Sequence, residues 1–563
     1  MTPAEDPAAT RSARLSQIAA AIVFVVVLFA PVGDDMPGAA RRTAAVAAAM
    51  AVLWLTQAVP LGATSLIPLL AFPLLGIQSA RDVSQSYIND SVFLYLGGFI
   101  IALGIERWGL HRRIALHVVR VVGVSPRRIV LGFALATAFL SMWISNTAAA
   151  MLMIPIAIAL LHSMDELAPA SGRREFSTAS EPAASASDPD ARKLGVALML
   201  AVAYAASIGG MTTLVGTPTN ISFRQIFATT FPDAPDVSAG QWMTSFVPLG
   251  VAMLLVMWLV LTFNLRPSPG VASLGRSFFS ERLRSLGAPS PAERRMFVVF
   301  AATALLWLFR TPLSISGDPD ASPLVPGWGP LMASGLRSLG VSEDAADGMV
   351  TDSTVAILMA VAMFFIPAGK PRDLDLKADA RGSTRCNLMD WPTANRLPWE
   401  VLLLFGGGFA LADGFAASGL SGYVGNEFAN AFGGQPAWVL VLATCALLTF
   451  LTEFTSNTAT CSIVLPILAP AAVRMGVDPR LMMVAAALSA SCAFMLPVAT
   501  PPNALVFGSG RVTVGEMARK GLTLNLIGIV LVTLAILWSY APQAGIVANE
   551  VPEWARSTTP ERR

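Results

Sequence analysis

The chain has 563 residues, of which 54% are hydrophobic and 13% are charged, and its formal net charge is +2. Soluble domains usually carry about 25% charged residues, so this composition excludes an ordinary soluble protein. The charges lie in loops between apolar runs, which predicts an all-α polytopic membrane protein in contact with a lipid bilayer. We expect no nucleic-acid partner.

Apolar runs predict about eleven full membrane spans. The first run follows a polar N-terminal stretch and lacks a convincing cleavage site, so we predict a retained span rather than a signal peptide. In chain order, the predicted spans lie near residues 17–31, 43–60, 62–77, 91–106, 194–223, 243–264, 295–310, 351–367, 397–416, 480–508 and 521–541.

Two further apolar segments, 129–161 and 436–472, are each interrupted by the tripeptide Ser-Asn-Thr. Each half of these segments is too short for a full span, which needs about 20 residues. We therefore predict two re-entrant helical hairpins with the tripeptide at the tip. Non-helical backbone at that depth is tolerated only where protein or a wet cavity surrounds it.

The loop charges predict the orientation. The loops 107–128, 265–295 and 370–396 are basic, whereas loop 311–350 is acidic and has Arg337 as its only basic residue. With eleven spans and two hairpins, the basic loops and the N-terminus fall on the cytoplasmic side, and the C-terminus falls outside. This predicts a multi-pass protein of the cell's inner (plasma) membrane.

The chain also contains an internal repeat. Residues 94–110 match residues 404–420 at eight of 17 positions, and the two Ser-Asn-Thr copies follow at nearly the same offset. An odd number of spans separates the two copies, which predicts inverted repeats of the kind found in transporters. The resulting division is 1–90 (tail and first helices), 91–264 (first repeat, with hairpin 129–161 and broken helix 194–223), 265–396 (basic loop and linking helices), 397–541 (second repeat, with hairpin 436–472 and broken helix 480–508) and 542–563 (C-terminal tail).

The repeated motifs suit an anion and a cation. Unpaired backbone N–H groups at a hairpin tip, with the positive end of the helix dipole, suit a carboxylate. Asparagine and carbonyl oxygens suit Na⁺. Prolines at 218, 501 and 502 break two more helices and free further carbonyls. No Lys or Arg occurs in 129–161, 194–223, 436–472 or 481–510. A dianion there would need bound Na⁺ to balance its charge.

These motifs resemble those of the divalent anion/sodium symporter family of di- and tricarboxylate and sulfate transporters. The resemblance extends over about residues 43–541, and the segment 490–506 fits the family's signature. It implies a homodimer in which each protomer has a scaffold domain and a transport domain that moves like an elevator. It further implies two or more coupling Na⁺ ions.

The resemblance also assigns roles to individual residues. Thr452 stands where a Ser is common in the family, and Thr219 stands where a second Pro is common, which we expect to loosen that broken helix slightly. One Na⁺ site is implied near Ser141, Ser145, Asn146 and Gly216, and a second near Thr452, Ser456, Asn457 and Ala499. The substrate carboxylates are implied to bind Ser145, Asn146, Thr147, Ser456, Asn457 and Thr458, with Thr217 and Thr500 adjacent.

The leading hypothesis is Na⁺-coupled uptake of a small dicarboxylate such as succinate, malate or fumarate. The alternatives on the same fold are sulfate or tricarboxylate symport, or dicarboxylate exchange. A channel is disfavoured by the inverted repeat, and an intramembrane enzyme by the absence of a catalytic dyad or HExxH motif from the apolar segments. Glu453, three residues before the second Ser-Asn-Thr, either interacts with a cation or forms hydrogen bonds within its hairpin.

Overall fold

The protein is mainly helical, with one two-stranded antiparallel sheet. The computed structural model describes residues 7–30, 36–123, 125–166, 189–265, 278–312, 323, 325–342, 346, 349–369 and 386–556. Most of the polar insertion near 163–192, and large parts of the loops 265–295, 311–350 and 370–396, lie outside these ranges. The termini 1–6 and 557–563 lie outside them as well.

Helices occur at each of the predicted span positions in the first half of the chain. They are α1 (Pro7–Phe29), α2 (Gly38–Thr56), α3 (Leu61–Thr64), α4 (Ile67–Leu74), α5 (Ala80–Gln85), α6 (Asp90–Arg107), α7 (Leu110–Val122), α8 (Pro126–Ser141), α9 (Asn146–Glu166), α10 (Pro189–Met211), α11 (Pro218–Thr230) and α12 (Ala239–Thr262).

In the second half of the chain, helices also occur at the predicted span positions. Its elements are α14 (Pro291–Leu308), α15 (Trp328–Ser338), α17 (Asp352–Phe365), β1 (Pro367–Gly369), β2 (Cys386–Asn387), α18 (Trp391–Ala394), α19 (Trp399–Ser418), α20 (Leu420–Phe432), α21 (Ala437–Leu451), α22 (Asn457–Arg474), α23 (Pro479–Ser489), α24 (Pro501–Gly508), α25 (Val514–Ala535), the π-helix η2 (Ile536–Tyr540), α26 (Ala541–Gln543) and α27 (Glu553–Arg556).

The all-α polytopic class is confirmed, but fewer helices are long and apolar enough to cross a membrane than the eleven predicted. Among the described residues, seven helices are long and apolar enough to cross a membrane, or eight if the pair α20–α21, bent by 110°, counts as one. Several predicted spans are short or divided, since α3 and α4 share one of them and α17 has 14 residues. The stretch 311–350, expected to be a loop, contains α15.

The helices break where the sequence predicts. Four residues separate α8 from α9, and five separate α21 from α22, at the two Ser-Asn-Thr motifs. The helix pairs α10–α11 and α23–α24 are broken before Pro218 and Pro501, which each occupy the first position of the following helix. Proline is favoured there because that position needs no N–H donor.

The two repeats interlock through these broken elements. Helix α9 of the first repeat packs against α24 of the second, and α22 of the second packs against α11 of the first. The repeat extends to the backbone, because Gly109 and Gly419 both adopt left-handed φ values, of 69° and 78°, at the starts of α7 and α20. Helix α20 was not predicted from the sequence, although it is the counterpart of the basic helix α7.

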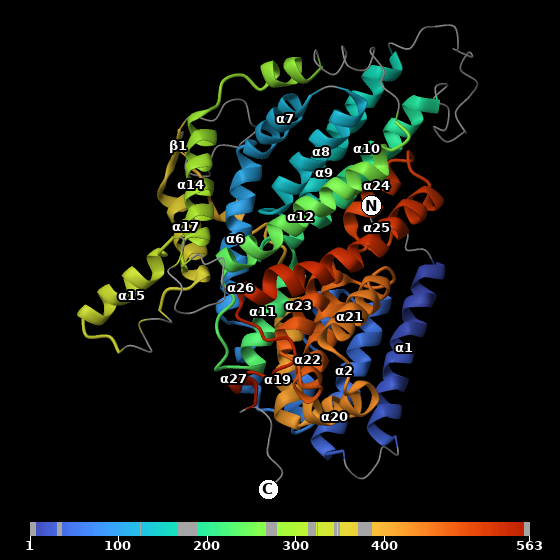
Figure 1. The fold of residues 1–563 in the computed structure, drawn as a ribbon, viewed down its shortest axis with the longest axis vertical. Coiled ribbons are helices and arrows are strands. Elements are labelled where there is room, and N and C mark those ends of the chain that lie inside the picture. Colours follow the sequence, from blue (N-terminus) through green and yellow to red (C-terminus); the bar gives the residue numbers. More distant parts are fainter. Residues whose placement is uncertain are drawn as a thin grey trace.

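A second group of helices lies beside the repeats. Helices α6, α14 and α17 pack together at one edge of the molecule, and α15 projects from that edge (Figure 1). Gly97 of α6 permits this packing, because a Cβ atom there would lie 2.6 Å from the carbonyl carbon of Ala356 in α17. Small residues such as Gly97 allow two membrane helices to approach closely.

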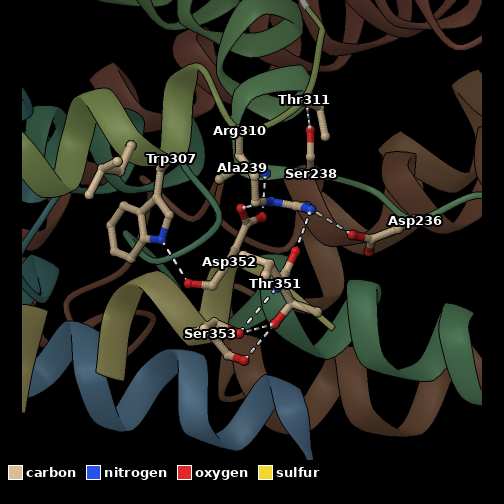
Figure 2. Close-up of polar contacts among 12 residues, drawn as sticks. Asp236, Ser238, Ala239, Trp307, Arg310, Thr311, Thr351, Asp352 and Ser353 are labelled. Atoms are coloured by element: carbon tan, nitrogen blue, oxygen red, sulfur yellow. Dashed lines mark hydrogen bonds and ion pairs between the residues drawn. The ribbon is translucent and has the colours of Figure 1, made fainter. Parts of the chain in front are cut away.

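Five charged residues join this edge to the repeats, and we call them the charge network: Asp90, Arg224, Asp236, Arg310 and Asp352. Arg310, just after α14, lies 2.5 Å from Asp352 and 3.1 Å from Asp236 (Figure 2). Arg224 of α11 lies 3.1 Å from Asp236 and 3.7 Å from Asp90 at the start of α6. The network therefore connects α6, α14 and α17 to α11 and to the loop before α12.

Neutral groups reinforce the same contact. The fully buried Asp352 carboxylate also accepts a hydrogen bond from the backbone N–H of Ala239, 2.8 Å away, at the start of α12. The hydroxyls of Ser238 and Thr311 lie 2.8 Å apart, and the Trp307 indole N–H donates to the Asp352 carbonyl at 2.9 Å (Figure 2). Charged and neutral bonds thus fix the start of α12 against the ends of α14 and α17.

Candidate functional site

The first oxygen cluster forms where α8 ends and α9 begins. The Ser141 hydroxyl oxygen lies 2.6 Å from Oδ1 of Asn146 and 2.7 Å from the carbonyl oxygen of Ala206 in α10. One hydroxyl has a single proton and can satisfy only one of these acceptors at a time. The cluster therefore holds more oxygen lone pairs than protons.

Two glycines bring further carbonyl oxygens to this cluster. A Cβ atom at Gly216 would lie 2.5 Å from the carbonyl oxygen of Gly210 and 2.9 Å from that of Ser141. A Cβ atom at Gly210 would lie 2.3 Å from Oδ1 of Asn146. Glycine is required at both positions because any side chain would displace these oxygens.

The second oxygen cluster repeats this arrangement. The Thr452 hydroxyl oxygen lies 2.5 Å from Oδ1 of Asn457 and 3.0 Å from the carbonyl oxygen of Ala490. Threonine thus provides the same hydroxyl contact here that serine provides in the first cluster. Neutral oxygen donors of this kind suit a hard cation such as Na⁺, so the residues present fit the ion that the sequence predicts. Ala499 is buried at the end of the α23–α24 linker, and its backbone N–H donates to Leu496 at 3.2 Å.

Asparagines fix the two linkers beside the clusters. The Asn220 side-chain amide donates to the carbonyls of Met211 and Thr213, at 3.1 and 2.8 Å, and so bridges the break between α10 and α11. The Asn503 amide donates to the carbonyls of Ala493 and Leu496, at 3.0 and 3.1 Å. Each of the two asparagines therefore joins the ends of its broken helix through side-chain hydrogen bonds.

The serine and asparagine of each Ser-Asn-Thr motif make different contacts. Asn146 and Asn457 are the first residues of α9 and α22, and their side chains belong to the oxygen clusters. The exposed Ser145 hydroxyl instead accepts from the backbone N–H of Ala148 at 3.2 Å, as a helix cap does. Ser456 is the N-cap of α22 and makes no side-chain capping bond.

The threonines expected to contact substrate differ in exposure. Thr147 is half-buried, whereas Thr458, Thr217 and Thr500 are buried. The Thr500 hydroxyl accepts from the backbone N–H of Asn503 at 3.3 Å and so caps α24. The contacts of these residues do not identify a ligand for any of the hydroxyls, and their predicted role in substrate binding stays a prediction.

A cavity of about 720 Å³ reaches the break between α8 and α9. Ser145 and Ala148 line it beside residues of α6 and α7 and the segment before α19. Its basic lining residues are Arg107, Arg112 and Arg396. The carboxylate of Glu106 also lines the cavity, and Arg107 forms an ion pair with Asp390 at 2.5 Å, so the lining bears charges of both signs.

The Glu453 carboxylate accepts hydrogen bonds from the linker between α23 and α24. One carboxylate oxygen accepts from the backbone N–H groups of Phe494 and Met495, at 2.8 and 2.9 Å, and from the Asn525 amide at 2.7 Å. The other oxygen accepts from Leu496 N–H at 3.0 Å. The predicted alternative to a cation contact was hydrogen bonding within the segment 436–472, whereas these bonds join Glu453 to the α23–α24 linker and to α25.

Two contacts at the broken helices were missed in the sequence. The Tyr95 hydroxyl of α6 donates to the carbonyl oxygen of Thr217 at 2.7 Å. The hydroxyls of Thr219 and Ser491 lie 3.0 Å apart and join the two repeats. Thr219 therefore ties its helix to the second repeat, whereas a proline there would have no hydroxyl to do so. The only sequence signal for Tyr95 was its place within the repeated 94–110 block.

A membrane-spanning helical fold with two matching oxygen clusters at helix breaks defines a transporter rather than an enzyme. The chain belongs to the family described as the sodium:sulfate symporter transmembrane region, which matches residues 11–543. The family resemblance predicted from the sequence is thereby confirmed.

The chain is similar to characterised relatives over most of its length. It is 36% identical over 529 residues to the sodium-dependent dicarboxylate transporter SdcS of Staphylococcus saprophyticus, covering 93% of this chain and 90% of the relative. It is 35% identical over 534 residues to SdcS of Staphylococcus aureus, covering 94% and 91%.

Solved structures share the fold at low sequence identity. The YdaH transporter of Alcanivorax borkumensis matches with a TM-score of 0.50 and 16% identity, over 83% of this chain and 88% of that chain. MtrF of Neisseria gonorrhoeae matches with a TM-score of 0.50 and 12% identity, over 98% of each chain. Both likenesses concern the fold alone.

Proposed function

We propose that this protein imports small dicarboxylates of the succinate, malate or fumarate kind by Na⁺-coupled symport. The observation that carries the proposal is the pair of oxygen clusters around Asn146 and Asn457, each short of protons and each built at a helix break. The relatives named sodium-dependent dicarboxylate transporters support the choice of ion and substrate.

The proposed coupling follows from charge. The segments 129–161, 194–223, 436–472 and 481–510 contain no Lys or Arg. Within these four segments a dianion would therefore meet only neutral dipoles and hydroxyls, because the arginines that line the cavity beside Ser145 (Arg107, Arg112 and Arg396) lie in other segments. Na⁺ ions in the two clusters would supply the missing positive charge, so Na⁺ would raise the affinity for the dicarboxylate, and the dicarboxylate would raise the affinity for Na⁺ by the same factor.

We assign the two hairpins, α8–α9 and α21–α22, and the broken helices to a transport domain that moves as an elevator within a homodimer. The α6–α14–α17 edge belongs to the scaffold in this assignment, so the charge network and the Tyr95–Thr217 bond cross the boundary between the two domains. The basic loops and the N-terminus face the cytoplasm of a cell bounded by the inner membrane, and the C-terminus faces outside. Eleven spans complete this topology.

Counterflow in proteoliposomes tests the proposal directly. Labelled succinate, sulfate and citrate are offered to the purified protein in Na⁺ or in choline at constant ionic strength, which separates coupling from general salt screening. We expect saturable succinate uptake in Na⁺ and little in choline. Preference for sulfate or citrate would change the substrate, and equal succinate uptake in choline would favour the exchanger.

Mutants distinguish the ion clusters from the helix caps. We expect Asn146→Ala to abolish Na⁺-driven uptake while the protein stays folded, because the substitution removes the hydrogen bond from the Ser141 hydroxyl, and one such bond contributes only about 1 kcal/mol. The matched control is Asn89→Ala, which removes the N-cap bond from the backbone N–H of Val92 at the start of α6 and leaves the oxygen cluster complete. A control variant that lost Na⁺ dependence as fully would contradict the assignment of the ion to the cluster.

A further inference from the structure

A second cavity lies among the ends of three long helices, away from the oxygen clusters. It has a volume of about 250 Å³ and is lined by the start of α10, the end of α12 and the start of α25. These helices pack against one another, α10 on α12 and α12 on α25, and all three pass the length and apolarity test for membrane spans (Figure 1). The cavity therefore sits where membrane-crossing helices reach the level of lipid headgroups.

The cavity rim is strongly basic. Four basic side chains line it, against one carboxylate, that of Glu516; the basic residues are Arg192, Lys193, Arg519 and Lys520. Glu516 is already engaged by Arg192, at 2.9 Å. The Lys520 ammonium donates one hydrogen bond to the carbonyl of Val260 at 2.7 Å, which fixes its position and leaves further N–H groups on the same nitrogen.

The cavity floor is apolar. Leu261 and Leu265 at the end of α12 are buried, and they lie beside residues of α10 that are apolar as well. The apolar lining residues are Val196, Ala197, Leu200, Leu261 and Leu265. A soluble anion would make favourable contacts only with the basic rim. A lipid would place its phosphate on the rim and its glycerol and first acyl carbons on the apolar floor.

The directions of two helices also favour a negatively charged group in this cavity. Both α10 and α25 begin at this cavity, and the positive ends of their dipoles favour a negative group there. Basic pockets between membrane helices at one membrane face are the usual binding places of anionic lipid headgroups. The mixture of basic rim and apolar floor matches a headgroup that bears one phosphate and no balancing cation.

We propose that this cavity is a binding site for an anionic phospholipid headgroup. The site involves α10, which also provides Ala206 and Gly210 to the first oxygen cluster. A bound lipid would therefore hold α10 against α12 and α25 and stabilise the helix on which that cluster depends. The inference is independent of the transported substrate.

The test compares lipids of equal chain length. The full-length protein is delipidated in detergent and titrated with phosphatidylglycerol or phosphatidylcholine, and bound lipid is counted by native mass spectrometry while the melting temperature is followed. We expect phosphatidylglycerol to bind more tightly and to raise the melting temperature more. Equal binding of the two lipids would overturn the proposal.

Variants locate the site. Each basic residue near an anionic surface contributes about 1 kcal/mol, so Arg519→Gln/Lys520→Gln is expected to weaken phosphatidylglycerol binding roughly thirtyfold. Glutamine retains a donor for the carbonyl of Val260. The matched control, Arg128→Gln, removes one exposed positive charge at the start of α8, outside the cavity. Loss of binding in the control equal to that in the double variant would refute the location.

A single variant and two soluble probes complete the experiment. Arg519 is exposed, so Arg519→Gln alone leaves the fold intact and is expected to weaken binding roughly fivefold even if the double variant fails to fold. Glycerol phosphate and inorganic phosphate serve as soluble probes of the rim. Stabilisation by either probe equal to that by phosphatidylglycerol would assign the site to a free phosphate and overturn the lipid assignment.

Discussion

Replacing Asp352 by asparagine is the sharpest perturbation of the charge network. The carboxylate is fully buried and accepts from Arg310 Nε at 2.5 Å and from Ala239 N–H at 2.8 Å. Asparagine keeps the shape but has one acceptor oxygen, so its amide N–H group must face one of the two donors. The substitution also leaves Arg310 with only Asp236 to balance its charge.

The magnitude follows from these contacts. Each hydrogen bond to a charged group is worth about 1.5–3 kcal/mol, and breaking a buried ion pair costs about 3–5 kcal/mol. The remaining bond to Asp236 offsets part of this, so we expect a loss of about 3 kcal/mol. With an unfolding entropy of about 2.1 cal/mol/K per residue, a chain of this size should melt about 3 °C lower.

A cysteine pair reports the same change locally. The hydroxyls of Ser238 and Thr311 lie 2.8 Å apart across the contact, so Ser238→Cys/Thr311→Cys should form a disulfide when α12 meets the end of α14. Cys386 is the one native cysteine that is not buried, so it is replaced by serine in this background. We expect Asp352→Asn to slow the cross-link several-fold.

The control is Asp82→Asn, which makes the same chemical change at an exposed position where the carboxylate accepts from Ser79 Oγ at 2.6 Å. It should melt and cross-link like the parent protein, because exposed substitutions usually change stability by less than about 0.5 kcal/mol. If Asp352→Asn behaved like this control in both assays, the network would not hold α12 to α14 and α17, and the reasoning would fail.

Three further predictions concern the site and its surroundings. Gly216→Ala should abolish Na⁺-dependent uptake, because its Cβ would lie 2.5 Å from the Gly210 carbonyl oxygen, whereas Gly515→Ala, with nothing within 4 Å, should not. Glu453→Gln should lower stability by about 1.5–3 kcal/mol in thermal unfolding, because an amide cannot accept all four hydrogen bonds that the carboxylate accepts. Burial alone would raise the pKa of Asp236, but Arg224 and Arg310 hold that pKa below its ordinary value. Its stabilising contribution should therefore be complete above about pH 4 and be lost only as the pH falls further, so the drop in melting temperature caused by Asp236→Asn should be the same at about pH 5 and pH 7.

The sequence predicted the parts of this structure that depend on local pattern. Apolar runs located the helices, and the Ser-Asn-Thr and proline motifs located the four breaks, because polar or N–H-free residues within an apolar helix leave a short-range signal. The repeat offset then paired Asn146 with Asn457 and Asn220 with Asn503, and the structure gives each pair equivalent hydrogen bonds.

The remaining contacts could not be predicted because they join distant segments. The charge network spans positions 90 to 352. Four of its members stand in loops or at helix ends, where single charges are ordinary, and the fifth, Arg224, lies in the middle of α11. Tyr95 lies 122 residues from the carbonyl that it contacts, within the apolar stretch 92–105 of α6. The counterpart of Tyr95 in the second repeat is Phe405, which has no hydroxyl, so the repeat gave no second copy to compare.

The packing of helices of one repeat against helices of the other has a consequence for the synthesis and insertion of the protein. Helix α9 is synthesised early, but α24, against which it packs, begins only at Pro501. During synthesis, the side of α9 that packs against α24 is therefore left uncovered until almost the entire chain has been made. A chain that stops before α24 would contain the first oxygen cluster's own residues and still leave α9 open to lipid or to quality-control proteases.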